Sequence, residues 1–361
     1  MNDSTVSFSQ ALRRRLLRNK GALFGMVLIG LAVLVAVFGY FLAPDPSPNA
    51  NRIILEIGGN KPGYTQEFLL LRKNPEPAPV GFFERLLNGV PDRADYIPVT
   101  WWRYQGDSLL VDKYVDEGLT ERRSYVPEDL AGKSATVRQR FLLGTDKYGR
   151  DILSRLIIGT RVSLTVGLVT VLISLSIGIF LGALAGYFGG KTDAVVMWLI
   201  NVLWSIPTLL LVFAITLLLG KGFWQVFIAV GLTLWVNVAR LVRGQVLATR
   251  ELSYVEAARA LGYSHFRTLF RHILPNILGP ILVIAASNFA SAIVIEAGLS
   301  FLGVGVQPPQ PSWGLMIKEN YNFIITNNPV LALAPGFAIM LLVLAFHLLG
   351  NGLRDALDVR G

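Results

Sequence analysis

The chain of 361 residues contains no cysteine, so it has no disulfide framework and no thiolate site. It also carries little charge: Asp, Glu, Lys and Arg make up 16% of its residues, against about 25% in an average soluble domain. Only three histidines are present and no His-Glu-x-x-His motif occurs. The sequence therefore supports neither a metal centre nor catalysis at a metal, and no cofactor is expected.

Hydrophobic residues make up 53% of the chain, and the mean hydropathy is +0.51. They gather in uncharged runs, and a run of about 20 residues is long enough to cross a bilayer. The runs cover about 21–43, 162–186, 194–219, 223–239, 277–303 and 330–350. This pattern predicts an all-α membrane protein with six transmembrane helices. In such a protein the net charge of +9 bears on orientation rather than on a nucleic-acid partner.

Basic residues indicate which ends of the spans face the cytoplasm. The N-terminal segment 1–20 carries Arg13, Arg14, Arg15, Arg18 and Lys20. A cleaved signal peptide would have a shorter apolar region and a small-residue cleavage site, so 21–43 is expected to be a retained anchor. The connection 240–275 contains six arginines, whereas the connections assigned to the outside have few basic residues, such as Lys221 and Lys318. By the positive-inside rule both chain ends and the loop 240–275 are cytoplasmic.

Residues 44–160 differ from the rest of the chain. The segment opens with "APDPSPNANR" and continues with "RKNPEPAPVG", and such proline-rich stretches are typical of turns and breaks. Charges of both signs follow, together with aromatic residues. We expect a polar extracytoplasmic insert between the first and second helices, with short strand-like pieces whose fold the sequence does not predict.

Four charged residues mark the end of this insert. They are Asp146, Arg150, Asp151 and Arg155. Opposite charges at i, i+4 favour a helix, here along the outer surface. A structural elbow is the preferred interpretation, and contact with a partner protein is the alternative.

The inner loop contains a compact pair of short helices. Ser253 and Glu256 form a capping box, which predicts a helix from Tyr254. Its apolar face would consist of Tyr254, Ala257, Ala258 and Leu261. Gly262 is placed to end this helix as a left-handed cap.

The second short helix would be capped by Ser264 and ended by Pro275. Its apolar face would consist of Phe266, Leu269, Phe270 and Ile273. From the residues alone, the helix pair is either a hinge that another protein contacts or an amphipathic connector lying on the headgroups.

"EAARALG" followed by "ILP" resembles the EAA motif of ABC importer permeases. Glu256, Ala257, Ala258 and Gly262 match the motif, and residues 273–275 close it. In that family the first short helix is the coupling helix, which docks into a cleft of the cytoplasmic ATPase subunit. The resemblance implies that the ATPase-coupling residues are Glu256, Ala257, Ala258, Leu261, Gly262 and Pro275.

Longer segments resemble the second permease subunit of dipeptide, oligopeptide and nickel importers. They are 143–164, 205–211, 299–314 and 351–360. The resemblance implies a type I (MetI-like) permease core over 161–361 in the bacterial inner membrane. It also implies a sister permease, two ATP-binding subunits and an extracytoplasmic substrate-binding protein as partners, besides membrane lipid. Peptides are the first expected substrate, with nickel, glutathione or a peptide-like antibiotic as alternatives. The insert departs from the family, whose outer loop is usually much shorter than 44–142.

Two near matches to catalytic motifs fail. In "PEDLAGKS" (127–134) Pro127 stands where a phosphate-binding loop requires glycine, so ATP must be hydrolysed by a separate subunit. In "GLSFLG" (298–303) Leu302 replaces the last glycine of a nucleophile elbow. The chain is therefore expected not to be an enzyme. A secondary transporter or channel is a more distant alternative. Such proteins usually place several charged or broken-helix sites near the membrane midplane, whereas the spans of this chain hold almost no charge.

Two residues inside the spans are candidates for a role in the pathway or its gate. Glu296 lies about 30 Å from the inner end of its span at 1.5 Å per residue. A solvated carboxylate at the outer interface is the preferred interpretation, and a polar group at an outer gate is the alternative. Pro207 is expected to kink the third span, since it removes a backbone hydrogen bond. That kink would shape a pore or merely accommodate packing.

Overall fold

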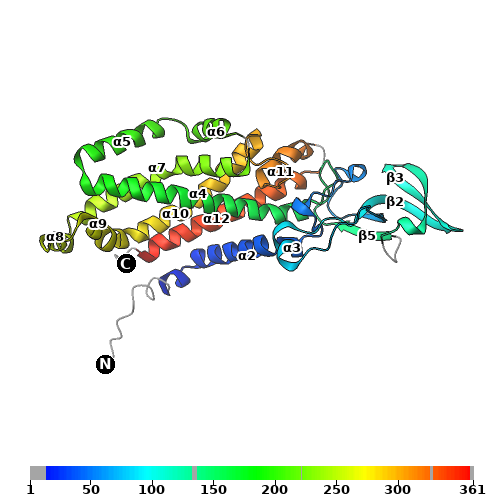
Figure 1. Ribbon diagram of the computed structural model, residues 1–361, viewed down its shortest axis with the longest axis horizontal. Helices are drawn as coiled ribbons and strands as arrows, with labels where there is room; N and C mark the ends of the chain where they lie inside the picture. The colour runs from blue at the N-terminus through cyan, green and yellow to red at the C-terminus, as the bar shows by residue number, and fades with distance from the viewer. Residues whose placement is uncertain (1–13, 132–135, 221, 326–327, 358–361) are drawn as a thin grey trace, which may run out of the picture. The chain divides into compact units, whose positions relative to one another are not determined.

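The computed structural model describes residues 14–131, 136–220, 222–325 and 328–357 (Figure 1). The chain divides into two compact units. Unit 1 comprises residues 1–32, 163–307 and 339–361, and unit 2 comprises 33–162 and 308–338. Some sequence predictions concern residues outside the described ranges. These residues are Arg13, Lys221, residues 132–134 of the rejected phosphate-binding loop, and residues 358–360 of the 351–360 motif.

Five helices of the described residues are long and apolar enough to cross a membrane. They are α2 (Lys20–Leu42), α4 (Ile152–Phe188), α7 (Phe223–Arg250), the helical stretch His265–Leu302, which ends in α10 (Leu278–Leu302), and α12 (Val330–Leu357). A sixth span is formed if α5 (Gly190–Trp204) and α6 (Thr208–Leu219) are counted as one bent helix pair. The prediction of a largely helical membrane protein with about six spans is confirmed.

The bend between α5 and α6 is 93°. Pro207 lies in the break and is the residue that precedes the first turn of α6. Its carbonyl accepts a hydrogen bond from the N–H of Leu211 at 3.0 Å, so α6 starts directly after the proline. The kink predicted at Pro207 is therefore present, and it is sharp enough to make two separate helices.

The core of unit 1 is built on α7, which packs against α5, α6 and α10. Small residues allow α4 to approach α7 closely. A Cβ added at Gly182 of α4 would lie 2.5 Å from the carbonyl oxygen of Ala239 and 3.0 Å from Cβ of Val242. Such contacts between small residues let backbones approach within a membrane, where helix association depends on close packing.

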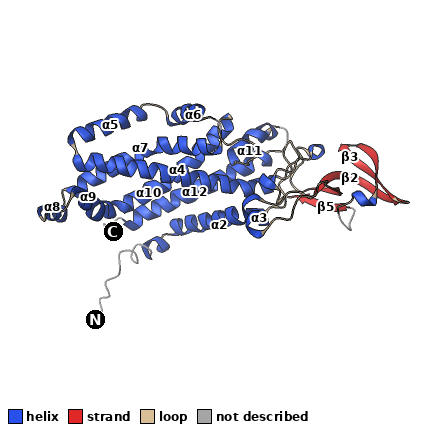
Figure 2. Ribbon diagram, viewed as in Figure 1, coloured by secondary structure: helices blue, strands red, loops and turns tan. Residues whose placement is uncertain are grey.

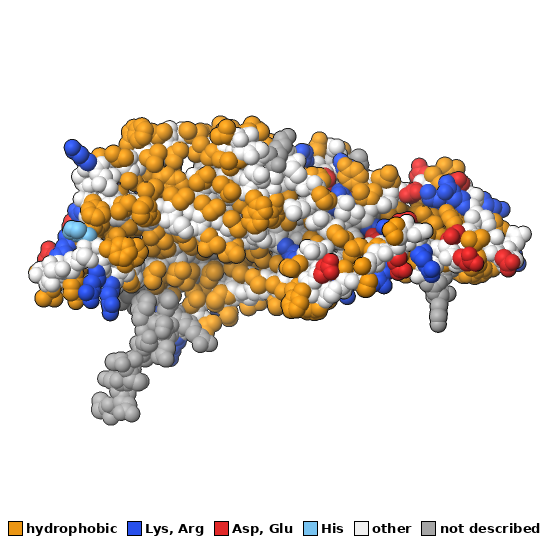
Figure 3. All heavy atoms as spheres, in the orientation of Figure 1, with side chains coloured by type: hydrophobic (Ala, Val, Ile, Leu, Met, Phe, Trp, Pro, Cys, Tyr) orange, Lys and Arg blue, Asp and Glu red, His pale blue; other side chains and the backbone are white. Residues whose placement is uncertain are grey.

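Large apolar side chains cover the outside of the helices. Examples on three helices are Leu34, Leu172 and Leu344, all of which are exposed. Figure 3 shows hydrophobic side chains over most of the face of unit 1 that it displays. In water such a surface would be costly, whereas in a bilayer it meets hydrocarbon, which fits the lengths of the helices.

Unit 2 contains a five-stranded antiparallel sheet with the order β4-β3-β2-β1-β5 (Figure 2). The strands are β1 (Tyr64–Arg72), β2 (Ala94–Gln105), β3 (Ser108–Asp116), β4 (Leu119–Tyr125) and β5 (Thr136–Phe141). Two-residue turns join β2 to β3 and β3 to β4. Each turn contains a glycine with positive φ, Gly106 at 57° and Gly118 at 76°, as tight hairpins require.

The sheet has apolar side chains packed on both faces. Leu69, Val99 and Leu109 belong to one cluster of buried residues. Phe68 and Phe141 belong to another, together with residues that precede β1. The expectation that the strand-like pieces are short is wrong for β2, which has 12 residues, and the fold that the sequence did not predict is a sheet with its own core. The short helix α3 (Phe82–Asn88) lies between β1 and β2 in the chain. The all-α description thus holds for the spans and not for the insert.

Candidate functional site

The inner loop forms helix α8 (Ser253–Ala260), directly after α7. The predicted capping box is not formed. Leu252 is the N-cap residue, and its carbonyl accepts hydrogen bonds from the N–H groups of Val255 (2.8 Å) and Glu256 (3.2 Å). Because the helix begins one residue earlier than predicted, Ser253 is already its first helical residue, and no side chain caps this end.

The buried face of α8 also differs from the predicted one. Val255 and Ala258 are buried, and Val255 packs in a core cluster with Leu269 and Ile273. Of the four predicted apolar positions only Ala258 is buried. Tyr254, Ala257 and Leu261 are exposed, as is Glu256. The helix is rotated about its axis relative to the prediction, and the motif residues Glu256, Ala257 and Leu261 face outward.

The C-terminal end of α8 is formed as predicted. Gly262 has φ +79°, and its N–H donates to the carbonyl of Arg259 at 2.9 Å. The N–H of Tyr263 donates to the carbonyl of Ala258 at 3.1 Å. These two bonds are the pair found in a Schellman cap, which requires the left-handed conformation that glycine adopts most easily.

The second short helix is capped as predicted, since Ser264 Oγ accepts a hydrogen bond from the N–H of Arg267 at 3.3 Å. It is not ended by Pro275. The α9 helix (His265–Thr268) continues as a π-helical turn, η4 (Leu269–Ile273), then as a 3-10 turn, η5 (Leu274–Ile277), and enters α10. Pro275 lies in the first turn of η5, where its missing N–H is tolerated. Such π-turns are frequent at functional sites.

Hydrogen bonds tie α8 to η4 and η5, and they tie α9 and α7 to the end of α4. The hydroxyl of Tyr254 donates to the carbonyl of His272 at 3.4 Å, and Nδ2 of Asn276 donates to that hydroxyl at 3.1 Å. The Tyr187 hydroxyl lies 3.0 Å from Nδ1 of His265. Nη1 of Arg250 donates to the carbonyl of Gly186 at 3.1 Å. Through its neighbours α7 and α9, α8 is thus connected to α4 and η5 by a contiguous set of contacts.

Glu296 is buried, with 1% of its surface exposed, so the expectation of a solvated carboxylate is wrong. The Ser300 hydroxyl donates to its Oε1 at 2.6 Å and accepts from the N–H of Val306 at 3.0 Å. After Gly303, which has φ +85°, the chain folds back onto the last turn of α10, so that Val306 reaches Ser300, the partner of the carboxylate. A distance along the helix axis did not reveal this fold-back.

The charged residues at the end of the insert are buried rather than on a surface helix. Arg150 Nε donates to Asp146 at 2.7 Å, and Arg150 Nη2 donates to Glu319 at 2.7 Å. Arg155 Nη2 lies 3.5 Å from the same Glu319 carboxylate. The helix expected here starts only at Ile152. Sequence reasoning missed Glu319, which is on α11 (Trp313–Asn320), because only the fold brings it to these arginines.

The turn before α4 explains this arrangement. Gly149 has φ +74°, and a Cβ there would collide with the carbonyl of Ile54, so the turn packs tightly against the first part of the insert. Asp151 then caps α4, since its Oδ2 accepts from the N–H of Ser154 at 2.8 Å. Burial raises the pKa of Asp151, and its hydrogen bonds with Ser154 act in the opposite direction. This is an elbow, the preferred interpretation of the sequence, but with a buried ionic core.

Two segments of this chain match known protein families. Residues 178–360 match the family described as "Binding-protein-dependent transport system inner membrane component". The chain belongs to this family. Residues 7–62 also match the "N-terminal TM domain of oligopeptide transport permease C". The family is a membrane component of transport systems rather than an enzyme, and the chain is a multi-pass membrane protein, as the sequence predicted.

Several characterised relatives are similar over long stretches. The dipeptide transport system permease protein DppC of Lactococcus lactis is 32% identical over 98% of this chain and 91% of its own length. DppC of Alkalihalophilus pseudofirmus is 36% identical over 75% of this chain and 94% of its own. The glutathione transport system permease protein GsiD of Pectobacterium atrosepticum is 45% identical over 60% of this chain and 71% of its own. The match to the lactococcal protein runs through the insert, so one relative has a segment of similar length there.

Among solved structures, an inward-facing MetNI methionine ABC transporter chain aligns with a TM-score of 0.48 and 19% identity, over 57% of this chain and 97% of that one.

Proposed function

We propose that the chain is the permease subunit of an ATP-driven ABC importer and forms half of a translocation pathway for dipeptides and oligopeptides. The family and the names of the dipeptide and oligopeptide permease relatives support this function. The observation that supports the coupling role is the orientation of α8. Its motif residues Glu256, Ala257 and Leu261 face outward, while Val255 and Ala258 fix it to the core.

The proposed partners follow from this role. A sister permease of similar fold would complete the pathway, and two cytoplasmic ATP-binding subunits would supply energy. Closure of those subunits would move α8, and the contacts of Tyr254 and Arg250 would pass the movement to the spans. An extracytoplasmic binding protein would deliver the substrate. ATPase coupling through Glu256, Ala257, Ala258, Leu261, Gly262 and Pro275 is part of this proposal.

The proposed location is the bacterial inner membrane, with both chain ends in the cytoplasm. The arginines of loop 240–275 support this orientation by the positive-inside rule. The outer insert would then lie on the side where the binding protein arrives. We propose that its sheet contacts that protein or the sister subunit, a role that deletion of residues 50–135 would test through uptake and assembly.

Pro207 and Glu296 are the two residues proposed for the pathway or its gate, and different observations bear on each. The 93° bend at Pro207 interrupts a span, as found where transporters line a cavity with broken helices. The burial of Glu296 within unit 1 favours a fixed polar group that holds the end of α10 over a side chain lining an open pathway. Unchanged uptake by a transporter with Glu296→Gln would exclude a role of this carboxylate in an outer gate.

A glutathione substrate is the second candidate, because GsiD is named as a glutathione transport permease and is 45% identical over its matched part. Uptake assays with the complete transporter in proteoliposomes test both, using a labelled dipeptide, a labelled oligopeptide, glutathione and nickel. The proposal predicts ATP-dependent uptake of the peptides above that of the other two. Uptake of glutathione or nickel alone would change the proposed substrate to that compound. Uptake without ATP would contradict the proposal of an ATP-driven importer.

A further inference from the structure

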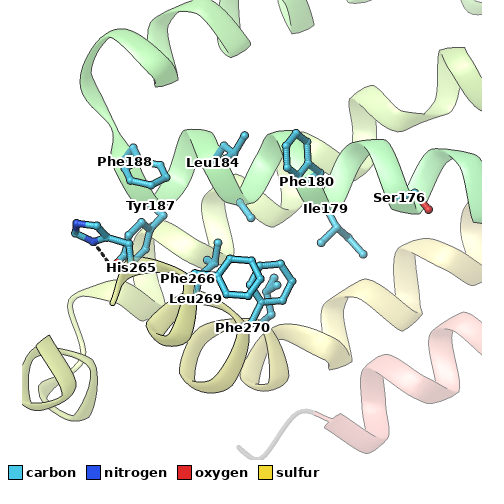
Figure 4. Close-up of a pocket in the computed structure, with 12 residues that line it drawn as sticks. Ser176, Ile179, Phe180, Leu184, Tyr187, Phe188, His265, Phe266, Leu269 and Phe270 are labelled. Atoms are coloured by element: carbon cyan, nitrogen blue, oxygen red, sulfur yellow. Dashed lines mark hydrogen bonds between the residues drawn. The ribbon is translucent and has the colours of Figure 1, made fainter. Parts of the chain in front are cut away.

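An apolar groove of about 500 Å³ lies between the last turns of α4 and the α9–η5 segment (Figure 4). Its lining residues come from α4 between Ser176 and Phe188 and from the segment between His265 and Leu274. In Figure 4 the side chains of Phe266, Leu269 and Phe270 extend toward α4, and Phe180 and Leu184 come from α4 itself. Phe180 and Phe266 are 62% and 71% exposed, so the groove presents an apolar surface that suits an apolar occupant.

The groove has the length of one bilayer leaflet. Ser176 and Phe188 lie at its two ends on α4, about 18 Å apart at 1.5 Å per residue. The hydrocarbon core of a bilayer is about 30 Å thick, so one leaflet contributes about half of that. The groove also opens on a span whose neighbouring side chains, such as Leu172, are exposed and apolar. An elongated apolar slot in this place fits a hydrocarbon chain better than a compact solute.

One end of the groove is polar and cationic. Tyr187 and His265 lie there, with the hydroxyl 3.0 Å from Nδ1 (dashed line in Figure 4). The guanidinium of Arg259 lies 4.9 Å from the centre of the Tyr187 ring. Nη1 of Arg250 donates to the backbone carbonyls of Gly186 and Tyr187. Positive charge at the end of a hydrocarbon slot is complementary to a phosphate headgroup.

We propose that this groove binds one acyl chain of an anionic phospholipid, with its phosphate at Arg259 and His265. The lipid would pack against Phe266 and Phe270, whose rings lie 4.2 Å apart at the edge of the π-turn η4. Lipid binding would therefore favour the arrangement of α9 and η4 seen here over alternatives in which they separate from α4. An effect of lipid on ATPase coupling rests on the proposed function, whereas binding itself does not.

The cysteine-free chain allows a site-specific test. Ser176→Cys carries a fluorophore at the apolar end of the groove, and Leu344→Cys carries it on an exposed position of α12 at a similar distance from the helix end. The complete transporter is placed in nanodiscs, and quenching by phosphatidylglycerol with a nitroxide on its acyl chain is compared with quenching by phosphatidylethanolamine labelled in the same way. Both leaflets contain both lipids, so the result depends on neither orientation nor transport.

We expect phosphatidylglycerol to quench preferentially at position 176 and both lipids equally at 344. Arg259→Gln should lower the preference at 176 by about fivefold, the contribution of one basic residue near an anionic surface. Arg240→Gln is the matched control, since Arg240 lies over the Trp204 ring rather than at the groove. Equal quenching by the two lipids at 176 would overturn the proposal in favour of ordinary lipid contact. No quenching there would overturn it in favour of a protein occupant, such as the sister permease.

Discussion

Arg150 and Glu319, 169 positions apart in the chain, form an ion pair at 2.7 Å with both side chains nearly inaccessible to solvent. The pair joins the turn before α4 to α11, two segments that are separated in the chain by the spans from α4 to α10. A charge buried in this way is stabilised only while its partner remains. The elbow at the start of α4 is thus held together by groups that cannot be lost singly without a large penalty.

Replacement of Glu319 by Ala should lower the free energy of unfolding by about 3–5 kcal/mol, because it leaves the two buried cations of Arg150 and Arg155 with the single carboxylate of Asp146. The melting temperature of the purified chain in detergent measures this loss. Glu121→Ala is the matched control, since it removes an ion pair with Arg123 that is about half exposed and should cost less than about 1 kcal/mol. Similar losses in both variants would show that the buried cluster is not an anchor.

Gly182→Ala should destabilise the packing of α4 against α7, since its Cβ would approach the Ala239 carbonyl to 2.5 Å. Overpacking of this kind typically costs about 1–3 kcal/mol. Gly244→Ala in α7 adds the same methyl group where no heavy atom lies within 4 Å, and should be neutral or stabilise the helix by up to about 1 kcal/mol. Thermal unfolding of the two variants should move in opposite directions, and equal stability would contradict the close approach.

Gly262→Val should loosen the end of α8, because a β-branched residue would have to adopt φ +79°. The left-handed conformation costs an ordinary residue about 1–2 kcal/mol. Amide hydrogen exchange over residues 253–263 should quicken in this variant. Gly262→Asn should change exchange much less, since Asn tolerates the left-handed region. Unchanged exchange in the valine variant would mean that the cap does not hold α8.

Pro207→Ala should straighten the break between α5 and α6, since it restores a backbone N–H to the interrupted helix. Spin labels at Trp198→Cys and Leu218→Cys, both exposed, report the distance between the two helices in the cysteine-free chain. The proline-to-alanine change should lengthen that distance. The same change at Pro335 inside the unbroken α12 serves as a control for removing an intramembrane proline. A distance unaffected by Pro207→Ala would assign the bend to packing alone.

Features set by local chemistry could be predicted from the sequence. Span lengths depend on runs of apolar residues, and the caps at Gly262 and Ser264 depend on residues within a few positions of each other. Pro207 gave the place of a kink, but not its size. Pro335 breaks nothing, which shows that the sharp bend also depends on the residues around position 207.

Features set by distant contacts could not be predicted. Phe68 and Leu69 are neighbours that pack on opposite faces of the sheet, so β1 lacks the simple alternation of a strand with one solvated face. The rotation of α8 depends on Val255 reaching Leu269 and Ile273. Glu296 is linked through Ser300 to Val306, which returns after Gly303, and Glu319 meets Arg150 only in the fold.

In the proposed function, the outward face of α8 passes the movement driven by ATP hydrolysis to the spans. Glu256→Arg reverses one exposed charge on that face, and Glu251→Arg makes the same reversal at an exposed position just before the helix. Uptake and ATPase activity of the complete reconstituted transporter are measured for both variants, after membrane insertion and subunit association are compared with the wild type.

Uptake and substrate-stimulated ATPase activity should collapse in Glu256→Arg while the chain still inserts into the membrane, and Glu251→Arg should retain most of both. Wild-type uptake and ATPase activity in Glu256→Arg would show that α8 is a surface connector, and would contradict the coupling role on which the proposed function rests.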